Sequence, residues 1–373
     1  MPVKNIFAVL ILFISCTVSK PQVYQEQNIP IKRVEVQKHR PKNIIFLIGD
    51  GMGLTQITAG MYMNKNQLEL ERMPIVGIHK SYSADDLITD SAAGATAFSI
   101  GHKTKNGYLG VDSLGRTHTT ILEECSNKGF ATGLVATSTI VHATPAAFLS
   151  HQSGREDYEA IAMDYYINGN CDILIGGGKK YFDRRVKDSI NLIEKLVQKG
   201  YTVNDYFQDD FQTLQIPNVN KYIFYTADGD PLPASQGRSY LAKAGKDAIQ
   251  FLNQKNKKGF FLMIEGSQID WGGHANTSEY IVSEVLDFNK VIKEALDFAI
   301  KDKNTLVVVT ADHETGGYTI NPGSKMDSLV TGFSTKKHTA AMIPVFAFGP
   351  GAENFSGIYE NTAIYYKIKN LLF

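Results

Sequence analysis

The apolar run Ile44-Ile45-Phe46-Leu47-Ile48 leads without a break into Gly49-Asp50-Gly51-Met52-Gly53. A continuous apolar run of this length predicts a strand that is buried on both faces of a sheet. The glycines that follow let the backbone turn sharply and approach a ligand closely. Asp50 therefore stands at the carboxyl end of the first expected strand. Taken alone, an Asp-Gly pair is more often a simple turn.

Six further runs resemble the first one, at 131–136, 172–175, 222–225, 260–264, 306–309 and 343–348. Amphipathic stretches between them predict helices over 156–167, 187–199, 240–254 and 278–301. This alternation indicates an α/β fold with a mostly parallel central sheet and helices on both faces, a three-layer sandwich. Because no repeat or low-complexity linker interrupts the pattern, we expect one domain over 42–373. Ligands of such sheets bind beyond the carboxyl ends of the strands.

The charge balance excludes some classes of partner. The 373 residues include 38 Lys and Arg and 38 Asp and Glu, so the formal net charge is zero. Such a chain has no bulk attraction for nucleic acid or for an anionic membrane, and we expect no nucleic-acid-binding module. Any anion must be bound at a local site.

The N-terminus has the composition of an export signal. Lys4 precedes an apolar run over 6–14, and small residues follow, which predicts a signal peptide over 1–19. Nine apolar residues are too few for a transmembrane span. Lipid attachment at Cys16 is the alternative to ordinary cleavage. Residues 20–41 read as a polar tether, and we expect an exported protein, periplasmic or secreted. We expect Cys125 and Cys171 to be buried thiols, although one bridge between them is conceivable.

Ser91 is the candidate nucleophile. It lies in Thr89-Asp90-Ser91-Ala92-Ala93, where small residues predict a helix start. A helix N-terminus offers unpaired N–H groups to an oxyanion such as phosphate. The alternative is an ordinary Asp or Ser N-cap. Because no Ser-His-Asp order or G-x-S-x-G elbow surrounds Ser91, a bound metal would have to activate it.

Polar side chains follow other expected strands. Pro145 is expected to hold Thr144 in an extended conformation, which would place His142 and Thr144 on one side of the chain. Arg155 follows and has the fork geometry that binds phosphate oxygens. A solvated surface arginine is the alternative interpretation.

Two later strands lead into histidine-rich stretches. Asp270 and His274 are four residues apart and would share one face of a helical turn, with Trp271 between them at the rim of the site. Asp312 and His313 can serve one metal only if the strand before them ends there. His338 precedes the last strand.

The residue types predict two kinds of metal site. Histidine with carboxylate at several strand ends suits zinc. Asp50, Thr144 and Glu265 offer only oxygen, which suits magnesium. Two metals about 4 Å apart stabilise the entering and leaving oxygens of an in-line displacement.

These motifs together resemble the alkaline phosphatases, over roughly 42–350. The matching stretches are Gly49-Asp50-Gly51-Met52-Gly53, Thr89-Asp90-Ser91-Ala92-Ala93, Ala143-Thr144-Pro145-Ala146-Ala147, Glu265-Gly266 with Asp270 and His274, and Thr310-Ala311-Asp312-His313-Glu314-Thr315-Gly316-Gly317. The resemblance implies two zinc ions and one magnesium ion. The stretch from His313 to His338 is short compared with other members, so both a monomer and a homodimer remain open.

The same resemblance implies roles for the residues. The first zinc is held by Asp270, His274 and His338; the second by Asp50, Asp312, His313 and the Ser91 oxygen; and the magnesium by Asp50, Thr144 and Glu265. Arg155 would hold two phosphate oxygens. The implied reaction is hydrolysis of phosphate monoesters through a phosphoserine, with inorganic phosphate as product and inhibitor.

His142 and Trp271 depart from part of that family, in which an aspartate and a lysine stand there. The pair resembles several marine and cold-adapted bacterial members. We expect both to surround the third metal from just outside its ligands.

Two other functions are consistent with parts of the pattern. A related phosphodiesterase, sulfatase or phosphomutase would share several ligands, but Arg155, placed to take two free oxygens, favours a monoester. A non-catalytic exported phosphate- or metal-binding protein would need no serine beside the metals.

Overall fold

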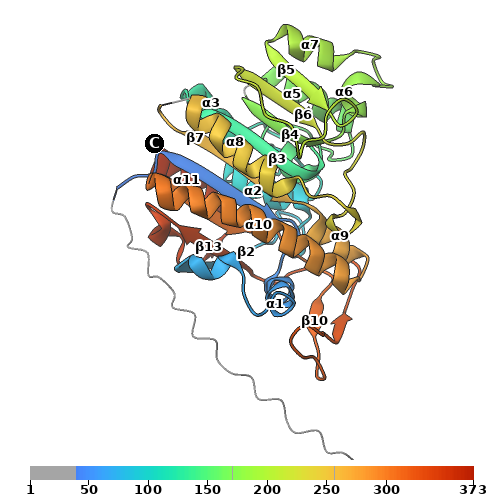
Figure 1. Ribbon diagram of the computed structural model, residues 1–373, viewed down its shortest axis with the longest axis vertical. Coiled ribbons are helices and arrows are strands. Elements are labelled where there is room, and N and C mark those ends of the chain that lie inside the picture. The colour runs from blue at the N-terminus through green and yellow to red at the C-terminus, as the bar shows by residue number, and fades with distance from the viewer. Residues whose placement is uncertain (1–38, 170, 256) are drawn as a thin grey trace, which may run out of the picture. The chain divides into compact units, whose positions relative to one another are not determined.

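A ten-stranded sheet runs through the part of the chain that this computed structural model describes, residues 39–373 except 170 and 256. The strand order is β14-β2-β13-β8-β1-β7-β3-β4-β6-β5 (Figure 1). The expected signal peptide, Cys16 and all but the last three residues of the expected tether lie outside the described residues. None of the described helices is both long and apolar enough to cross a membrane.

The sheet is mostly parallel, as expected. Its strands are β1 (Asn43–Gly49), β2 (Ile75–Lys80), β3 (Ala131–Thr139), β4 (Ile173–Gly177), β5 (Tyr201–Asp205), β6 (Lys221–Tyr225), β7 (Phe260–Gly266), β8 (Thr305–Thr310), β13 (Ile343–Phe348) and β14 (Gly357–Glu360). Only β13 runs antiparallel to its neighbours β2 and β8 among these strands. Fully buried β1 lies between β7 and β8, so three carboxyl ends meet at its Asp50 end.

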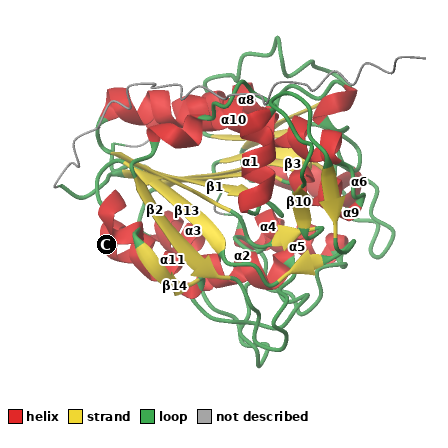
Figure 2. Cartoon of the chain, turned by 90° about the horizontal axis from the view of Figure 1, so that it is seen from below, coloured by secondary structure: helices red, strands yellow, loops and turns green. Residues whose placement is uncertain are grey.

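Helices cover both faces of the sheet (Figure 2). One face carries α1 (Leu54–Tyr62), α8 (Leu241–Lys255) and α10 (Ser278–Asp302), and the other carries α2 (Ser91–Ile100), α3 (Ile121–Asn127) and α11 (Thr362–Leu372). The shorter helices are α4 (Ala143–Ala146), α5 (Tyr158–Asn168), α6 (Lys180–Asp183), α7 (Leu192–Gln198) and α9 (Gln268–His274). The α/β class is therefore confirmed.

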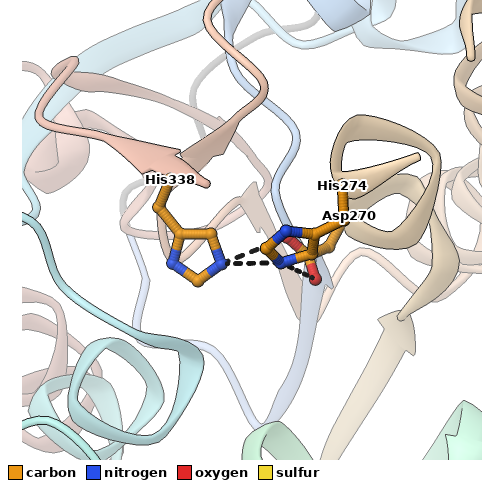
Figure 3. Close-up of side chains that lie close together, drawn as sticks. All are labelled: Asp270, His274 and His338. Atoms are coloured by element: carbon orange, nitrogen blue, oxygen red, sulfur yellow. Dashed lines mark hydrogen bonds and ion pairs between the residues drawn. The ribbon is translucent and has the colours of Figure 1, made fainter. Parts of the chain in front are cut away.

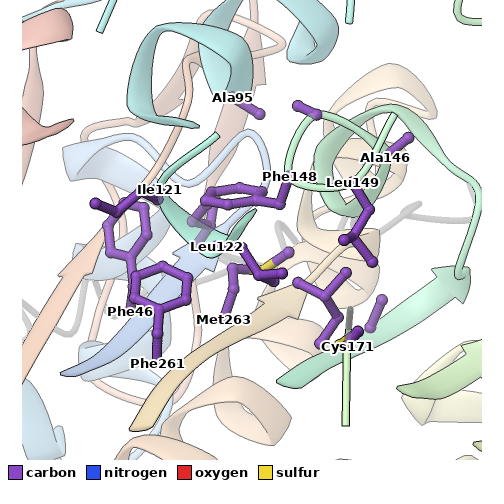
Figure 4. Packing of buried hydrophobic residues seen from close by; sticks show 14 of the residues in the cluster. Phe46, Ala95, Ile121, Leu122, Ala146, Phe148, Leu149, Cys171, Phe261 and Met263 are labelled. Carbon is purple, nitrogen blue, oxygen red and sulfur yellow. The ribbon is translucent and has the colours of Figure 1, made fainter. Parts of the chain in front are cut away.

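A separate apolar core lies on each face of the sheet. On the α2 face, Phe46 of β1 contacts Phe148 edge to face at 6.3 Å between ring centroids, and Phe148 contacts Phe261 of β7 at 6.2 Å (Figure 4). Burying each ring stabilises the fold by about 1.5–3 kcal/mol. Cys125 and Cys171 are buried free thiols, as expected.

Several boundaries differ from the predicted ones. The helix expected from residue 187 begins only at Leu192, because the Asn191 side chain accepts from the amides of Ile193 and Glu194 and caps it there. The sequence pattern also missed β2, β5 and β14. Strand β2 alternates between buried and partly exposed residues and so has no continuous apolar run.

Candidate active site

Ser91 is the first residue of α2, as the small residues around it predict. The Asp90 side chain caps this helix by accepting from Ala93 N at 2.9 Å. The interpretation as a cap is therefore right for Asp90 and leaves the Ser91 hydroxyl available. Ser91 is 1% exposed and its Oγ lies 3.2 Å from Nε2 of His313.

The turn after β1 brings Asp50 close to the later strands. Gly51 has φ +70°, and a Cβ there would lie 2.7 Å from the Cα of Asp270 and 2.7 Å from Oγ1 of Thr315. A glycine is therefore required for both the backbone conformation and the close approach.

Asp270, His274 and His338 form the first group of candidate metal ligands (Figure 3). Asp270 and His274 share one face of α9, as their spacing predicts, and His338 comes from the two-residue strand β12 (His338–Thr339). The two histidine Nε2 atoms lie 3.1 Å apart, and Asp270 oxygens lie 3.3 Å from His274 Nε2 and 3.4 Å from His338 Nε2.

The hydrogen bonds of these two rings fix their tautomers. Nδ1 of His274 lies 2.6 Å from the carbonyl oxygen of Lys336, and Nδ1 of His338 lies 2.8 Å from that of Thr89. A carbonyl oxygen only accepts, so both Nδ1 atoms carry the hydrogen. In the neutral rings both Nε2 lone pairs then face each other and Asp270. A cation between the two Nε2 atoms would bind both lone pairs and the Asp270 carboxylate. Histidines whose Nδ1–H is bonded to a backbone carbonyl are typical of metal ligands.

The second group surrounds Nε2 of His313. Asp312 Oδ2 lies 3.2 Å from it, Asp50 Oδ1 lies 3.5 Å from it, and Ser91 Oγ lies 3.2 Å from it. The residues Asp50, Asp270 and His313 can also hold one ion among them. Strand β8 (Thr305–Thr310) ends before Asp312 and His313, which therefore lie in a loop. Both side chains can face one site for this reason, because adjacent residues within a strand would face opposite sides.

This arrangement differs from a Ser-His-Asp triad. In a triad the carboxylate holds the histidine nitrogen that faces away from the serine. Here one nitrogen of His313 faces the serine and both carboxylates. The other nitrogen, Nδ1, lies 3.3 Å from the Thr315 hydroxyl, which itself donates to Asp270. Because this hydroxyl donates to Asp270, it accepts from Nδ1–H, and the Nε2 lone pair is left pointing at the serine and the carboxylates.

The third group lies deeper. Asp50, Glu265 and His142 offer atoms close enough to hold one ion, and Thr144 is fully buried beside them. Both Asp50 carboxylate oxygens, Glu265 Oε1 and Thr144 Oγ1 are buried without a hydrogen-bond partner. Buried oxygens of this kind are costly unless a donor or a cation meets them. The donor set therefore fits a metal ion.

The expected extended conformation of Thr144 is wrong. Ala143–Ala146 forms the helical turn α4, with His142 at its N-cap. Pro145 is tolerated there because amides in the first turn of a helix need no partner within it. The turn still brings His142 and Thr144 to the site.

His142 is placed differently from the oxygen ligands. Its Nε2 lies 3.5 Å from Arg155 Nη2, which can only donate, so its hydrogen resides on Nδ1. Its ring meets Trp271 edge to face at 6.0 Å. Burial and the nearby Arg155 charge lower the pKa of His142 to about 3. His142 is thus neutral, and its Nδ1 is buried without a hydrogen-bond partner.

The remaining ionisable groups show strong mutual repulsion. Burial and the neighbouring carboxylates Asp312, Asp270 and Glu265 raise the pKa of Asp50 well above its usual value. Burial raises the pKa of Glu265 to about 8, and burial with the Asp270 charge raises that of Asp312 to about 6. A metal would remove this repulsion by supplying positive charge.

The first group shows the opposite pattern. The hydrogen bond to Asp270 raises the pKa of His274 to about 9. Burial alone would lower the pKa of His338, but Asp270 outweighs it and raises that pKa. The Asp270 carboxylate therefore favours positive charge on these two rings, which is the charge that a cation would supply.

Arg155 reaches the site from the loop before α5. Its Nη1 donates to Asp90 Oδ2 at 3.0 Å, and its side chain is 20% exposed. The interpretation as a freely solvated surface arginine is therefore wrong. Asp90 directly precedes Ser91, so this ion pair ties the guanidinium to the start of α2.

Sequence reasoning missed three contributors to this geometry. It gave no role to Glu314 or Thr315, although both lie within the motif at 310–317, and it did not connect Asp90 with Arg155. A side chain that acts by hydrogen-bonding a ligand carries no spacing signal of its own.

Comparisons with known proteins agree with this geometry. The family model described as "Alkaline phosphatase" matches residues 41–331. "Alkaline phosphatase 3" of Bacillus subtilis is 36% identical to the chain, with 87% of each chain covered.

Solved structures give the same result. The alkaline phosphatase from the Antarctic bacterium TAB5 is 43% identical, with a TM-score of 0.84, covering 90% of this chain and 99% of that one. A mutant of that protein, 42% identical with the same TM-score and coverage, is described with Mg bound in the M3 site.

Proposed function

The chain belongs to the alkaline phosphatase family, whose members hydrolyse phosphate monoesters, and we propose that it does so through Ser91 with two zinc ions and one magnesium ion. The observation that carries this proposal is the convergence of the Ser91 hydroxyl with Asp50 and Asp312 on Nε2 of His313. A binding protein would have no need for a hydroxyl at that point.

Each group of donors is assigned an ion. Asp270, His274 and His338 would hold the first zinc; Asp50, Asp312, His313 and Ser91 the second; and Asp50, Thr144 and Glu265 the magnesium. Bound zinc would lower the pKa of the serine hydroxyl and stabilise negative charge on the entering and leaving oxygens. The magnesium described for a mutant of the similar Antarctic protein supports a third ion here.

Ser91 forms the new bond in the first step. Its hydroxyl proton passes to water and its oxygen attacks phosphorus in line with the leaving alkoxide. The bond from phosphorus to that alkoxide breaks, and the alkoxide takes a proton from water. Water then attacks the phosphoserine and releases inorganic phosphate and the free serine. Arg155, oriented by Asp90, binds two non-bridging oxygens of the phosphoryl group throughout.

His142 and Trp271 complete the surroundings. His142 orients Arg155 from one side and would donate to a water on the magnesium from the other. Trp271 packs against His142 and takes no ion. We further propose export to the periplasm or beyond the cell, with a homodimer as the candidate assembly.

Turnover of three esters of the same leaving group tests the function. Protein stripped of metal and restored with zinc and magnesium is assayed with a phosphate monoester, a phosphate diester and a sulfate ester. We expect the monoester to be preferred by several powers of ten, because the Arg155 guanidinium and the proposed cations would match its two negative charges, whereas the diester and the sulfate ester carry one negative charge each. Preference for the diester or the sulfate, or no turnover at all, would contradict the proposal.

A further inference from the structure

Glu314 is a buried carboxylate beside the site that the reaction itself does not use. It is 6% exposed and follows His313 directly. It belongs to the two-residue strand β9 (Glu314–Thr315), which pairs with β12 so that Glu314 faces Thr339. Strands of two residues are too short to hold their pairing alone. Side-chain contacts must supply the remaining restraint on β12, which carries His338.

Four donors from three segments converge on this carboxylate. Oε1 accepts from Nε2 of Gln56 at 2.7 Å and from the amide of Tyr318 at 3.1 Å. Oε2 accepts from the amide of Gly317 at 3.2 Å and from the hydroxyl of Thr339. We call these five residues the Glu314 clamp. It joins α1, the turn after β9 and β12.

The clamp is packed without spare room. A Cβ at Gly53 would lie 2.4 Å from Cγ of Glu314, so the start of α1 touches the side chain. The second amide hydrogen of Gln56 is donated to the carbonyl of Thr315 at 2.8 Å. The carboxylate therefore has a single position relative to the turn after Asp50.

We propose that Glu314 is a positioning residue that holds His338 in place opposite Asp270 and His274. This inference rests on the proposed function, which assigns a metal ion to those three residues. Thr339 follows His338 in the sequence, and its hydroxyl donates to Oε2 of Glu314. Without that acceptor, Thr339 and the Gly317 amide lose their buried partner and β12 is released. Outside the first group of candidate ligands, the His338 ring would then keep its bond to Thr89 and its stacking on His313.

The test compares Glu314→Gln with two variants at the other end of the contact. Thr339→Val removes only the hydroxyl, and Thr339→Ser keeps it as the matched control. Metal-free proteins are titrated with zinc against a chromophoric chelator, and His338→Ala identifies which binding step belongs to the first group. We expect Glu314→Gln and Thr339→Val to weaken that step by about 10–100-fold and to leave the other step unchanged. Thr339→Ser should match the parent.

A second readout does not depend on metal. Hydrogen exchange over 336–341 in the metal-free chain should rise in Glu314→Gln and Thr339→Val, while exchange over 268–274 stays constant. If both variants keep parental zinc affinity and parental exchange, Glu314 does not position His338. Equal weakening of every zinc step would show a general structural role and would also overturn the proposal.

Failure of the proposed function would look different. If the parent and His338→Ala bind the same number of zinc ions with the same affinity, the metal assignment is wrong. Exchange over 336–341 would then still decide whether Glu314 restrains β12.

Discussion

Nε2 of His274 lies 3.1 Å from Nε2 of His338, while Nδ1 of each ring is already bonded to a backbone carbonyl. Two neutral imidazoles cannot hydrogen-bond through those lone pairs, so the arrangement requires a proton or a metal. His338→Ala should therefore lower the zinc content by one ion while the other group keeps its own. Metal analysis of purified variant and parent checks this. Equal zinc content in both would contradict the assignment.

His142→Asp changes the deepest group. The variant places a carboxylate where a neutral ring now faces Asp50 and Glu265, and the added negative charge should raise magnesium affinity. Activity should then depend more strongly on added magnesium while the site fills. Magnesium titration of parent and variant measures the shift, expected to be about 10–100-fold. Loss of zinc in the variant would show that His142 is a zinc ligand after all.

Trp271→Lys introduces a cation beside the phosphate position. Trp271 packs on His142, whose other neighbour is Arg155, so a lysine there would reach the same anion. Phosphate should inhibit the variant at lower concentration, and turnover should fall if product release limits the rate. Phosphate inhibition constants and turnover of the variant, compared with a Trp271→Phe control, decide this. Unchanged inhibition would separate Trp271 from the phosphate site.

The sequence predicted the parts of the site that follow directly from strand ends. Asp50 after β1, the Asp270 and His274 pair on α9, and Ser91 at the start of α2 all carry local signals. The sequence did not predict the helical turn at Thr144, because the preference of a residue before proline yields to packing there. Contacts between distant segments also leave no local pattern: the bond between Asp90 and Arg155 spans 65 positions.

The fold followed the same rule. Strands buried on both faces were predicted from continuous apolar runs, whereas β14 at the edge of the sheet and β2 beside it were not, because their partly exposed residues break the run. Short β9 and β12 exist only through tertiary pairing.

His79 should contribute to acid sensitivity. It is fully buried, its Nε2 lies 2.9 Å from the carbonyl of Ala311, and burial lowers its pKa from 6.5 to about 4. On acidification the unfolded chain takes up this proton before the folded chain does. Stability is therefore unaffected above pH about 6.5 and falls as the pH drops toward 4, by about 3 kcal/mol in total.

His79→Gln keeps a donor for Ala311 and removes the titration. In metal-free protein its melting temperature should fall less than that of the parent between pH about 7 and about 4. Parallel pH profiles of the two proteins would mean that His79 does not contribute.

The central claim is that Ser91 carries the phosphoryl group, and trapping that group measures it most directly. Parent protein and Ser91→Ala, both with zinc and magnesium, are mixed with labelled phosphate monoester, quenched in acid and mapped by mass spectrometry. We expect one phosphate on Ser91 of the parent and none on the variant. The variant should keep its metals while its turnover falls by several powers of ten. Label on any other residue, or a variant that turns over as the parent does, would contradict the account.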